Sequence, residues 1–159
     1  MKLTLVAPAR RKSGKQGLTG RAFQIPPLSL GILASLTPPE IEVKLMDENL
    51  HDLDFSDAPD LVGITCLTAS APRAYEIARK FRTRGARVVL GGIHPSAVPL
   101  EAIQHADSVV LGEAEGVWGQ VLEDFKADKM KRFYKGAKPD PSQIFGPRRD
   151  IYERKGYFV

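Results

Sequence analysis

Short apolar runs alternate with segments of helical spacing along most of this 159-residue chain, and this alternation constrains the fold more than any other feature. The runs are too short for helices, and most lack strict polar–apolar alternation, so they are typical of strands buried on both faces. They are residues 3–8, 41–46, 61–67, 88–90 and 108–111. Strands that alternate with helices form parallel sheets with right-handed crossovers. The sequence therefore predicts an α/β, Rossmann-like, doubly wound domain.

The intervening segments carry helix signals. Apolar residues recur at i, i+3, i+4 and i+7 from Ala74 to Phe81, which predicts a helix with Ser70 as its N-terminal cap and Gly85 as its C-terminal cap. Helices are expected over residues 28–36, 70–85, 99–105 and 117–125. This order of elements predicts a five-stranded, flavodoxin-like sheet with strand order 2-1-3-4-5.

The pattern stops near residue 129, which predicts a domain over residues 1–128 and a linker over 129–159. The linker holds nine Lys or Arg and three Asp or Glu, so the remaining residues carry 14 basic and 16 acidic side chains. We interpret the linker as leading toward a further, C-terminal domain that this chain lacks.

A second basic cluster lies within residues 10–21, in a predicted loop that contains glycines. Such a loop suits an anion, and a solvated loop explains the same charges equally well. No aromatic residues interleave these charges, so a nucleic-acid partner is not expected.

Composition excludes several classes of protein. The 43% hydrophobic and 26% charged shares are those of a globular protein, and no apolar run reaches the roughly 18 residues of a membrane span. No signal peptide is recognisable, so we expect a cytoplasmic location. The single cysteine, Cys66, is expected in the core and excludes an internal disulfide or an all-cysteine cluster. No Walker A loop, nucleophile elbow or ligand-spaced histidine pair is present, so we expect neither a catalytic residue nor a metal ligand.

The informative positions are the carboxyl ends of the predicted strands, where open α/β sheets bind ligands. Small and hydroxyl-bearing residues gather there. They are Thr68, Ala69 and Ser70 after the third run, Gly91 and Gly92 after the fourth, and Gly112 after the fifth. Glycines give room and free N–H groups, and hydroxyls give hydrogen bonds, which together suit a large planar cofactor with a polar fringe.

Four stretches, taken together, resemble a known family. Residues 65–68 (Thr-Cys-Leu-Thr), 91–95 (Gly-Gly-Ile-His-Pro) and 112–115 (Gly-Glu-Ala-Glu), with the helix at 26–33, resemble the cobalamin-binding N-terminal domain of cobalamin-dependent radical S-adenosylmethionine enzymes. The resemblance covers about residues 1–128. It implies that Thr65 and Leu67, with the two glycines, admit the nucleotide tail of cobalamin.

The resemblance also extends the set of expected cofactor-binding residues. His94 is expected either to contact the cofactor or to brace the Gly-Gly loop, and Glu113 either to meet the cofactor's amide fringe or to cap the last helix. The full set is Thr65, Leu67, Thr68, Ala69, Ser70, Gly91, Gly92, His94, Pro95, Gly112 and Glu113.

One departure from related domains is informative. Methionine-synthase-type domains carry Asp-x-His-x-x-Gly after the first strand, whereas residues 8–13 here contain no histidine. The resemblance therefore implies base-off cobalamin without a protein histidine ligand.

The resemblance further implies a larger parent enzyme. A [4Fe–4S] cluster needs Cys-x-x-x-Cys-x-x-Cys, which one cysteine cannot supply. The cluster and S-adenosylmethionine would belong to the radical domain that follows, in an enzyme that transfers methyl groups to carbon, and this chain alone would not be catalytic. Two alternatives stay open on the sequence, namely a flavodoxin-like nucleotide- or flavin-binding domain and a non-catalytic protein-interaction domain.

Overall fold

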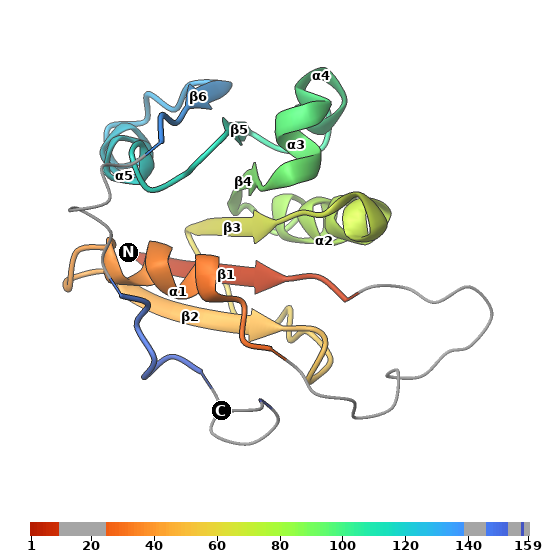
Figure 1. Cartoon of the computed structure of the whole chain (residues 1–159), viewed down its shortest axis with the longest axis vertical. Coiled ribbons are helices and arrows are strands. Elements are labelled where there is room, and N and C mark those ends of the chain that lie inside the picture. The colour runs from red at the N-terminus through yellow and green to blue at the C-terminus, as the bar shows by residue number, and fades with distance from the viewer. Residues whose placement is uncertain (10–24, 139–145, 153–156, 158–159) are drawn as a thin grey trace.

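A parallel sheet forms the centre of the domain in the computed structural model, which describes residues 1–9, 25–138, 146–152 and 157 (Figure 1). Within these residues the sheet has six strands in the order β2-β1-β3-β4-β5-β6. The strands are β1 (Lys2–Ala7), β2 (Glu42–Asp47), β3 (Leu61–Thr65), β4 (Arg87–Gly91), β5 (Ser108–Leu111) and β6 (Phe133–Lys135). Every neighbouring pair is parallel, which confirms the predicted fold class and the predicted order of the first five strands.

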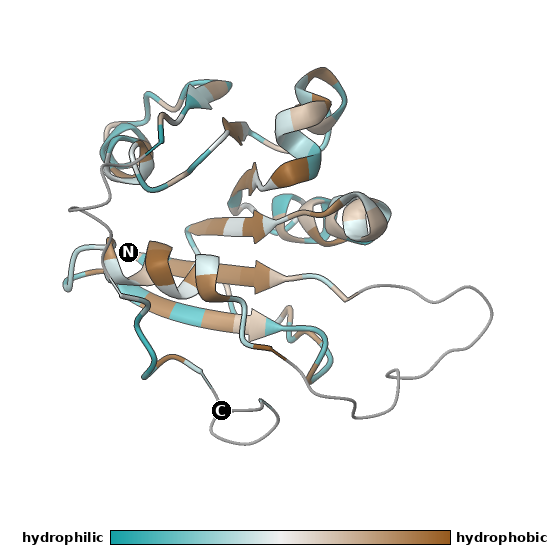
Figure 2. Cartoon of the chain, viewed as in Figure 1, coloured by the Kyte–Doolittle hydropathy of each residue, from teal (hydrophilic) through white to brown (hydrophobic). Residues whose placement is uncertain are grey.

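Helices cover both faces of the sheet, so the inner strand β3 is apolar along its length, as its colouring shows (Figure 2). On one face α2 packs Ile77 and Phe81, both 0% exposed, against strand residues such as Val62. On the other face α1 and α5 pack Leu30 and Trp118. The helices are α1 (Leu28–Ser35), η1, a 3₁₀ turn (Thr68–Ser70), α2 (Ala71–Arg82), α3 (Ile93–Ala97), α4 (Pro99–Ala102) and α5 (Trp118–Lys126). No helix among the described residues is both long and apolar enough to cross a bilayer.

The two ends of α2 test the capping residues predicted from the sequence. Gly85 follows the helix with φ +90°, as a C-terminal glycine cap requires. Ser70 precedes the helix, as predicted, but its side chain makes no cap hydrogen bond. Its hydroxyl donates to the Leu67 carbonyl and accepts from the Leu67 N–H, both at 3.2 Å, because η1 turns the chain one step earlier.

Helix α3 and strand β6 were not predicted. Pro95 lies within the first turn of α3, where its missing N–H costs nothing. β6 has only three residues, so no periodicity announces it. It lies in the segment interpreted as a linker and pairs with β5.

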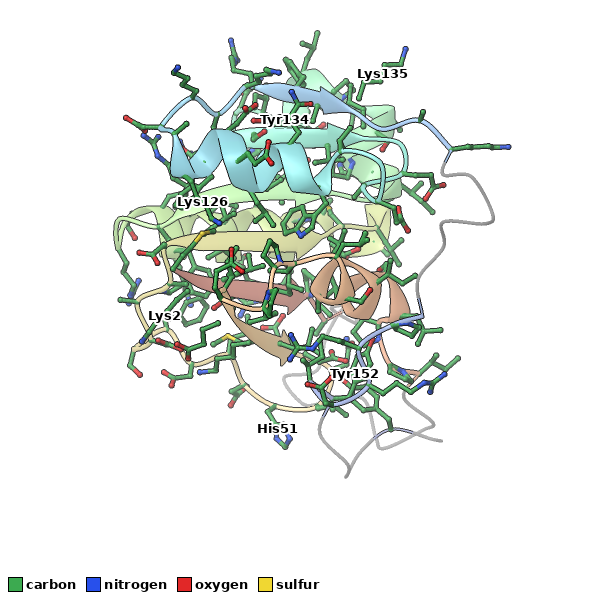
Figure 3. The ribbon with its side chains drawn as sticks, turned by 90° about the vertical axis from the view of Figure 1, so that its left-hand side faces the viewer. Lys2, His51, Lys126, Tyr134, Lys135 and Tyr152 are labelled. Atoms are coloured by element: carbon green, nitrogen blue, oxygen red, sulfur yellow. The ribbon has the colours of Figure 1, made fainter. Side chains whose placement is uncertain are left out.

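Tyr134 anchors β6 to the domain. Its ring is 3% exposed and lies against α5, on the α1/α5 side of the sheet (Figure 3). Its hydroxyl donates to Asp124 Oδ2 at 2.9 Å and accepts from the Lys131 N–H at 3.0 Å. β6 is therefore an integral part of the sheet.

The segment 146–152 packs on α1. The Arg148 N–H donates to the Gly31 carbonyl at 3.0 Å, and the Tyr152 hydroxyl donates to the Pro27 carbonyl at 3.2 Å, which places Tyr152 beside α1 (Figure 3). A Cβ on Gly31 would lie 2.9 Å from Pro147 Cβ, so the glycine permits this close contact. The basic cluster within residues 10–21 lies outside the described residues.

We expect Tyr134→Phe to lower the free energy of unfolding by about 1–2 kcal/mol, because the ring stays in place while two buried hydrogen bonds are lost. Chemical denaturation monitored by circular dichroism measures the change. Lys129→Gln, at an exposed side chain beside the same helix, is the control and should change stability by less than about 0.5 kcal/mol. Equal stabilities of Tyr134→Phe and the wild type would show that β6 is not held through this hydroxyl.

Candidate functional site

The carboxyl ends of the strands meet at one edge of the sheet, and most of the predicted site residues lie there. β1 is followed in the chain by β2 on one side of it, and β3 lies on its other side, so the strand order reverses between β1 and β3. Ligands of doubly wound sheets bind in the crevice at such a point. Thr65 and Gly91 are paired in register at the ends of β3 and β4, and Leu67, Thr68 and Ala69 are exposed directly after β3.

Gly91 leaves open space on the face covered by α1 and α5. A Cβ built there would meet nothing closer than Val110 Cβ at 3.9 Å, and Val110 belongs to the core on that face. Thr65 shares the face, because strand side chains alternate and Gly63, two residues earlier, faces Trp118 of α5. Gly91 and the Thr65 hydroxyl therefore lie side by side at the carboxyl edge, on the face covered by α1 and α5.

Gly92 has a different reason to be glycine. Its φ is +105°, and a Cβ would lie 2.9 Å from the Cys66 carbonyl oxygen and 3.1 Å from the Cys66 nitrogen. A side chain there would collide with the backbone leaving β3 and would not extend into a cleft. The sequence analysis gave Gly91 and Gly92 the same role, whereas in the structure they are glycine for different reasons.

Hydrogen bonds join the loops after β3 and β4. The Cys66 N–H donates to the Gly91 carbonyl at 2.8 Å, and the His94 N–H donates to the Cys66 carbonyl at 3.2 Å. Pro95, two residues into α3, is buried. The first turn of α3 is therefore held directly against the end of β3.

The His94 imidazole is bound by α2 and α4. Its Nε2 lies 3.0 Å from the Tyr75 hydroxyl and 3.4 Å from Glu101 Oε1, while the Tyr75 hydroxyl donates to the same Glu101 oxygen at 2.9 Å. Since the phenol proton goes to Glu101, His94 Nε2 acts as the donor to Tyr75. His105 stacks on the Tyr75 ring with centroids 3.9 Å apart. This geometry supports the bracing alternative for His94, and a direct contact with cofactor stays a prediction.

The same network shifts two pKa values. The hydrogen bonds from Tyr75 and then His94 lower the pKa of Glu101 below its ordinary value. Burial, followed by the hydrogen bond to Glu101, raises the pKa of Tyr75. Glu101 therefore stays ionised and Tyr75 stays protonated near neutral pH, so the hydrogen bond between them is kept there.

The chain that follows β6 packs closely against Gly112 and Glu113, which follow β5. Gly112 has φ +74°, and its Cβ would lie 2.9 Å from the Gly136 carbonyl oxygen. The Gly136 N–H donates to the Leu111 carbonyl at 2.8 Å. Glu113 is exposed, and the N-cap residue of α5 is Val117, with no side-chain cap hydrogen bond, so the alternative that Glu113 caps this helix is wrong. A cofactor contact of Glu113 stays a prediction.

Sequence reasoning missed two residues that fix the chain where it leaves β1. Glu48, at the end of β2, accepts the Ala9 N–H at 2.9 Å and Arg73 Nε at 2.8 Å. The side chains of Glu48 and Arg73 are 11% and 17% exposed, so this ion pair is largely shielded from water. The partners are 25 residues apart, and no spacing in the sequence reveals such a pair.

A surface hollow of about 140 Å³ lies elsewhere, at the outer edge strand β2. His51, Ile151 and Tyr157 contribute to its wall. β2 is separated from β3 and β4 by β1, so this hollow is distinct from the strand ends at Thr65 and Gly91. Among the described residues no group of three or more His, Cys, Asp or Glu side chains is placed to hold a metal ion.

Fold and site together define a doubly wound ligand-binding domain whose small and hydroxyl residues line the carboxyl edge of the sheet. The B12 binding domain family matches residues 18–122, more than half of the chain. The chain therefore belongs to the B12-binding domain family, which confirms the cobalamin-binding part of the resemblance.

Curated relatives extend the comparison. The chain is 45% identical over 121 residues to bacteriochlorophyllide d C-8(2)-methyltransferase of Chlorobaculum tepidum, and 36% identical over 124 residues to bacteriochlorophyllide d C-12(1)-methyltransferase of the same organism; each match covers 76% of this chain. An uncharacterized methyltransferase of Pyrococcus horikoshii is 35% identical over 138 residues, or 77% of this chain. The matched regions make up 27%, 27% and 29% of these relatives, so the chain spans little more than a quarter of their length.

Cys66 is 0% exposed, and burial, with a smaller contribution from the negative charge of Glu101, raises the pKa of its thiol to about 12. The native thiolate population at about pH 8 is then roughly a thousandfold below that of an ordinary thiol. We expect iodoacetamide to label the native chain far more slowly than the urea-unfolded chain, as measured by mass spectrometry. Rapid labelling of the folded chain at about pH 8 would show that the thiol is accessible or acidic.

Proposed function

We propose that this chain is the cobalamin-binding module of a larger radical S-adenosylmethionine enzyme that transfers methyl groups to carbon. Membership of the B12-binding domain family supports the cofactor, and two relatives named as methyltransferases of bacteriochlorophyllide support the reaction class. The single observation that carries the proposal is the open space at Gly91, at the carboxyl edge of a chain that belongs to this family.

The residues at this edge fit the nucleotide tail of cobalamin. Gly91 leaves space that a side chain would fill, Thr65 offers a hydroxyl on the same face, and Ala7 ends β1 with a small side chain. Leu67 is 38% exposed directly after β3, where an apolar side chain can pack against a macrocycle. When bound, cobalamin supplies a cobalt centre that can carry a methyl group, and the chain's own residues bind it, orient it and exclude water.

We further propose that the cofactor is held base-off and without histidine ligation. Residues 8–23 contain no histidine. His94 is engaged by Tyr75 and Glu101 on the side of α2 and α4, and His105 is stacked on Tyr75. His94 cannot leave these partners without breaking the contacts that hold α3.

The iron–sulfur cluster and S-adenosylmethionine belong, in this proposal, to a domain outside the chain. The relatives are more than three times as long as the matched region, and the chain has one cysteine, which is buried. Residues 129–159 would connect the two parts, with β6 and segment 146–152 holding the start of that connection against the cobalamin module.

Gly91→Leu should weaken cobalamin binding by roughly 10- to 100-fold, because its side chain would project into the space proposed for the tail. Titration of the chain with hydroxocobalamin, followed by absorbance, measures the dissociation constant. Gly119→Leu is the matched control, because a Cβ at Gly119 meets nothing within 4 Å on the outer side of α5. Wild-type affinity in a folded Gly91→Leu variant would place the cofactor elsewhere.

Electron paramagnetic resonance of the complex with cob(II)alamin tests the mode of binding. We expect no superhyperfine splitting from an axial nitrogen, because neither the benzimidazole nor a histidine would reach the cobalt. His94→Ala should leave the spectrum unchanged. Nitrogen splitting in the wild type that disappears in His94→Ala would instead identify His94 as a ligand.

A further inference from the structure

Ser96 of α3 joins two loops at the carboxyl edge of the sheet through its hydroxyl group. Its Oγ donates to the Gly92 carbonyl at 2.8 Å and accepts the Gly112 N–H at 3.0 Å. Gly92 follows β4 and Gly112 follows β5, so the serine spans the ends of neighbouring strands. The side chain is half-buried.

The Ser96 hydroxyl connects the two loops directly. The backbone bonds that hold each loop, from the Ser96 N–H to the Gly92 carbonyl and from the Gly136 N–H to the Leu111 carbonyl, do not join one loop to the other. Gly92 and Gly112 both have positive φ and no side chain that packs. The β4–β5 ladder pairs only Val89 with Ser108 and Leu90 with Val109, so it stops short of both loops. Beyond it, the Ser96 hydroxyl continues the connection between the strands.

His94 fixes the same helix from its other side. α3 has five residues, too few to be a stable helix alone, so tertiary contacts must hold it. His94 provides them through Tyr75 of α2 and Glu101 of α4. With the imidazole fixed two residues before it, the Ser96 hydroxyl is presented to both loops in one orientation.

We propose that Ser96 is a positioning residue of the cofactor site, which makes the Gly92 and Gly112 loops one unit and so fixes their spacing at the carboxyl edge of the sheet. This inference rests on the proposed cobalamin function. Ser96 need not touch the cofactor. It sets the position of the backbone that does.

The test compares Ser96→Ala with Ser96→Thr in the 159-residue chain. Loss of both hydrogen bonds should raise the dissociation constant for hydroxocobalamin roughly 5- to 10-fold and speed its dissociation to match. Ser96→Thr, which keeps the hydroxyl, should stay within about twofold of the wild type. Ser35→Ala is the matched control, because it removes a half-buried helix hydroxyl that bonds the Ile32 carbonyl of α1, away from both loops.

Amide hydrogen exchange without cofactor gives an independent readout. The Gly112 N–H should be protected in the wild type and in Ser96→Thr, and should lose protection in Ser96→Ala. Unchanged cobalamin affinity in a Ser96→Ala variant that has lost this protection overturns the role of Ser96, and so does a Thr variant as weak as the Ala variant.

Two further outcomes are separable. A wild-type chain that binds no hydroxocobalamin overturns the proposed function itself, and the role of Ser96 falls with it. If Ser96→Ala does not fold, Tyr75→Phe carries the test, because it removes the hydroxyl that holds His94. Faster cofactor dissociation from Tyr75→Phe supports the inference, and an unchanged rate overturns it.

Discussion

The close approach of Gly92 to the backbone of Cys66 is the contact on which the carboxyl edge of this sheet depends. A Cβ at Gly92 would lie 2.9 Å from the Cys66 carbonyl oxygen, so only glycine lets the chain leaving β4 turn against the chain leaving β3. That turn brings the His94 N–H to the Cys66 carbonyl and starts α3 directly at the edge. The contacts of His94 and Ser96 with neighbouring elements follow from this one placement.

The two faces of the sheet are built for different purposes at this edge. On the α2 side this edge is closed by Tyr75 of α2, which holds the His94 imidazole and packs against the core. On the α1/α5 side the ends of β1, β3 and β4 carry Ala7, Thr65 and Gly91. The side chains at these three positions are smaller than those of Tyr75 and His94 on the α2 side of the sheet. A parallel sheet with one rigid face and one accommodating face is suited to hold an inserted group without losing its own packing.

The sequence predicted the parts of this arrangement that depend on local pattern. Residue type and spacing predicted the strands, the helix closed by Gly85 and the small residues after the third, fourth and fifth strands. The family resemblance indicated that the carboxyl edge of the sheet is the binding site. Neighbours distant in sequence were invisible to such reasoning. Glu48 with Arg73 and Ser96 with Gly112 are separated by 25 and 16 residues. The distinction between Gly91 and Gly92 also needed coordinates, because it depends on which neighbour a Cβ would meet. β6 was not predicted because it has no repeating pattern; one buried tyrosine, Tyr134, stabilises it.

The burial of Cys66 has a practical consequence. The chain's one thiol is inaccessible, so a cysteine introduced at an exposed position would be the only one open to a spin label or fluorophore. Ile93 and Leu100, 71% and 74% exposed on α3 and α4, offer such positions close to the carboxyl edge of the sheet. Pairs of labels placed there and on α1 would turn the width of the crevice into a measurable distance distribution, without first removing a native cysteine.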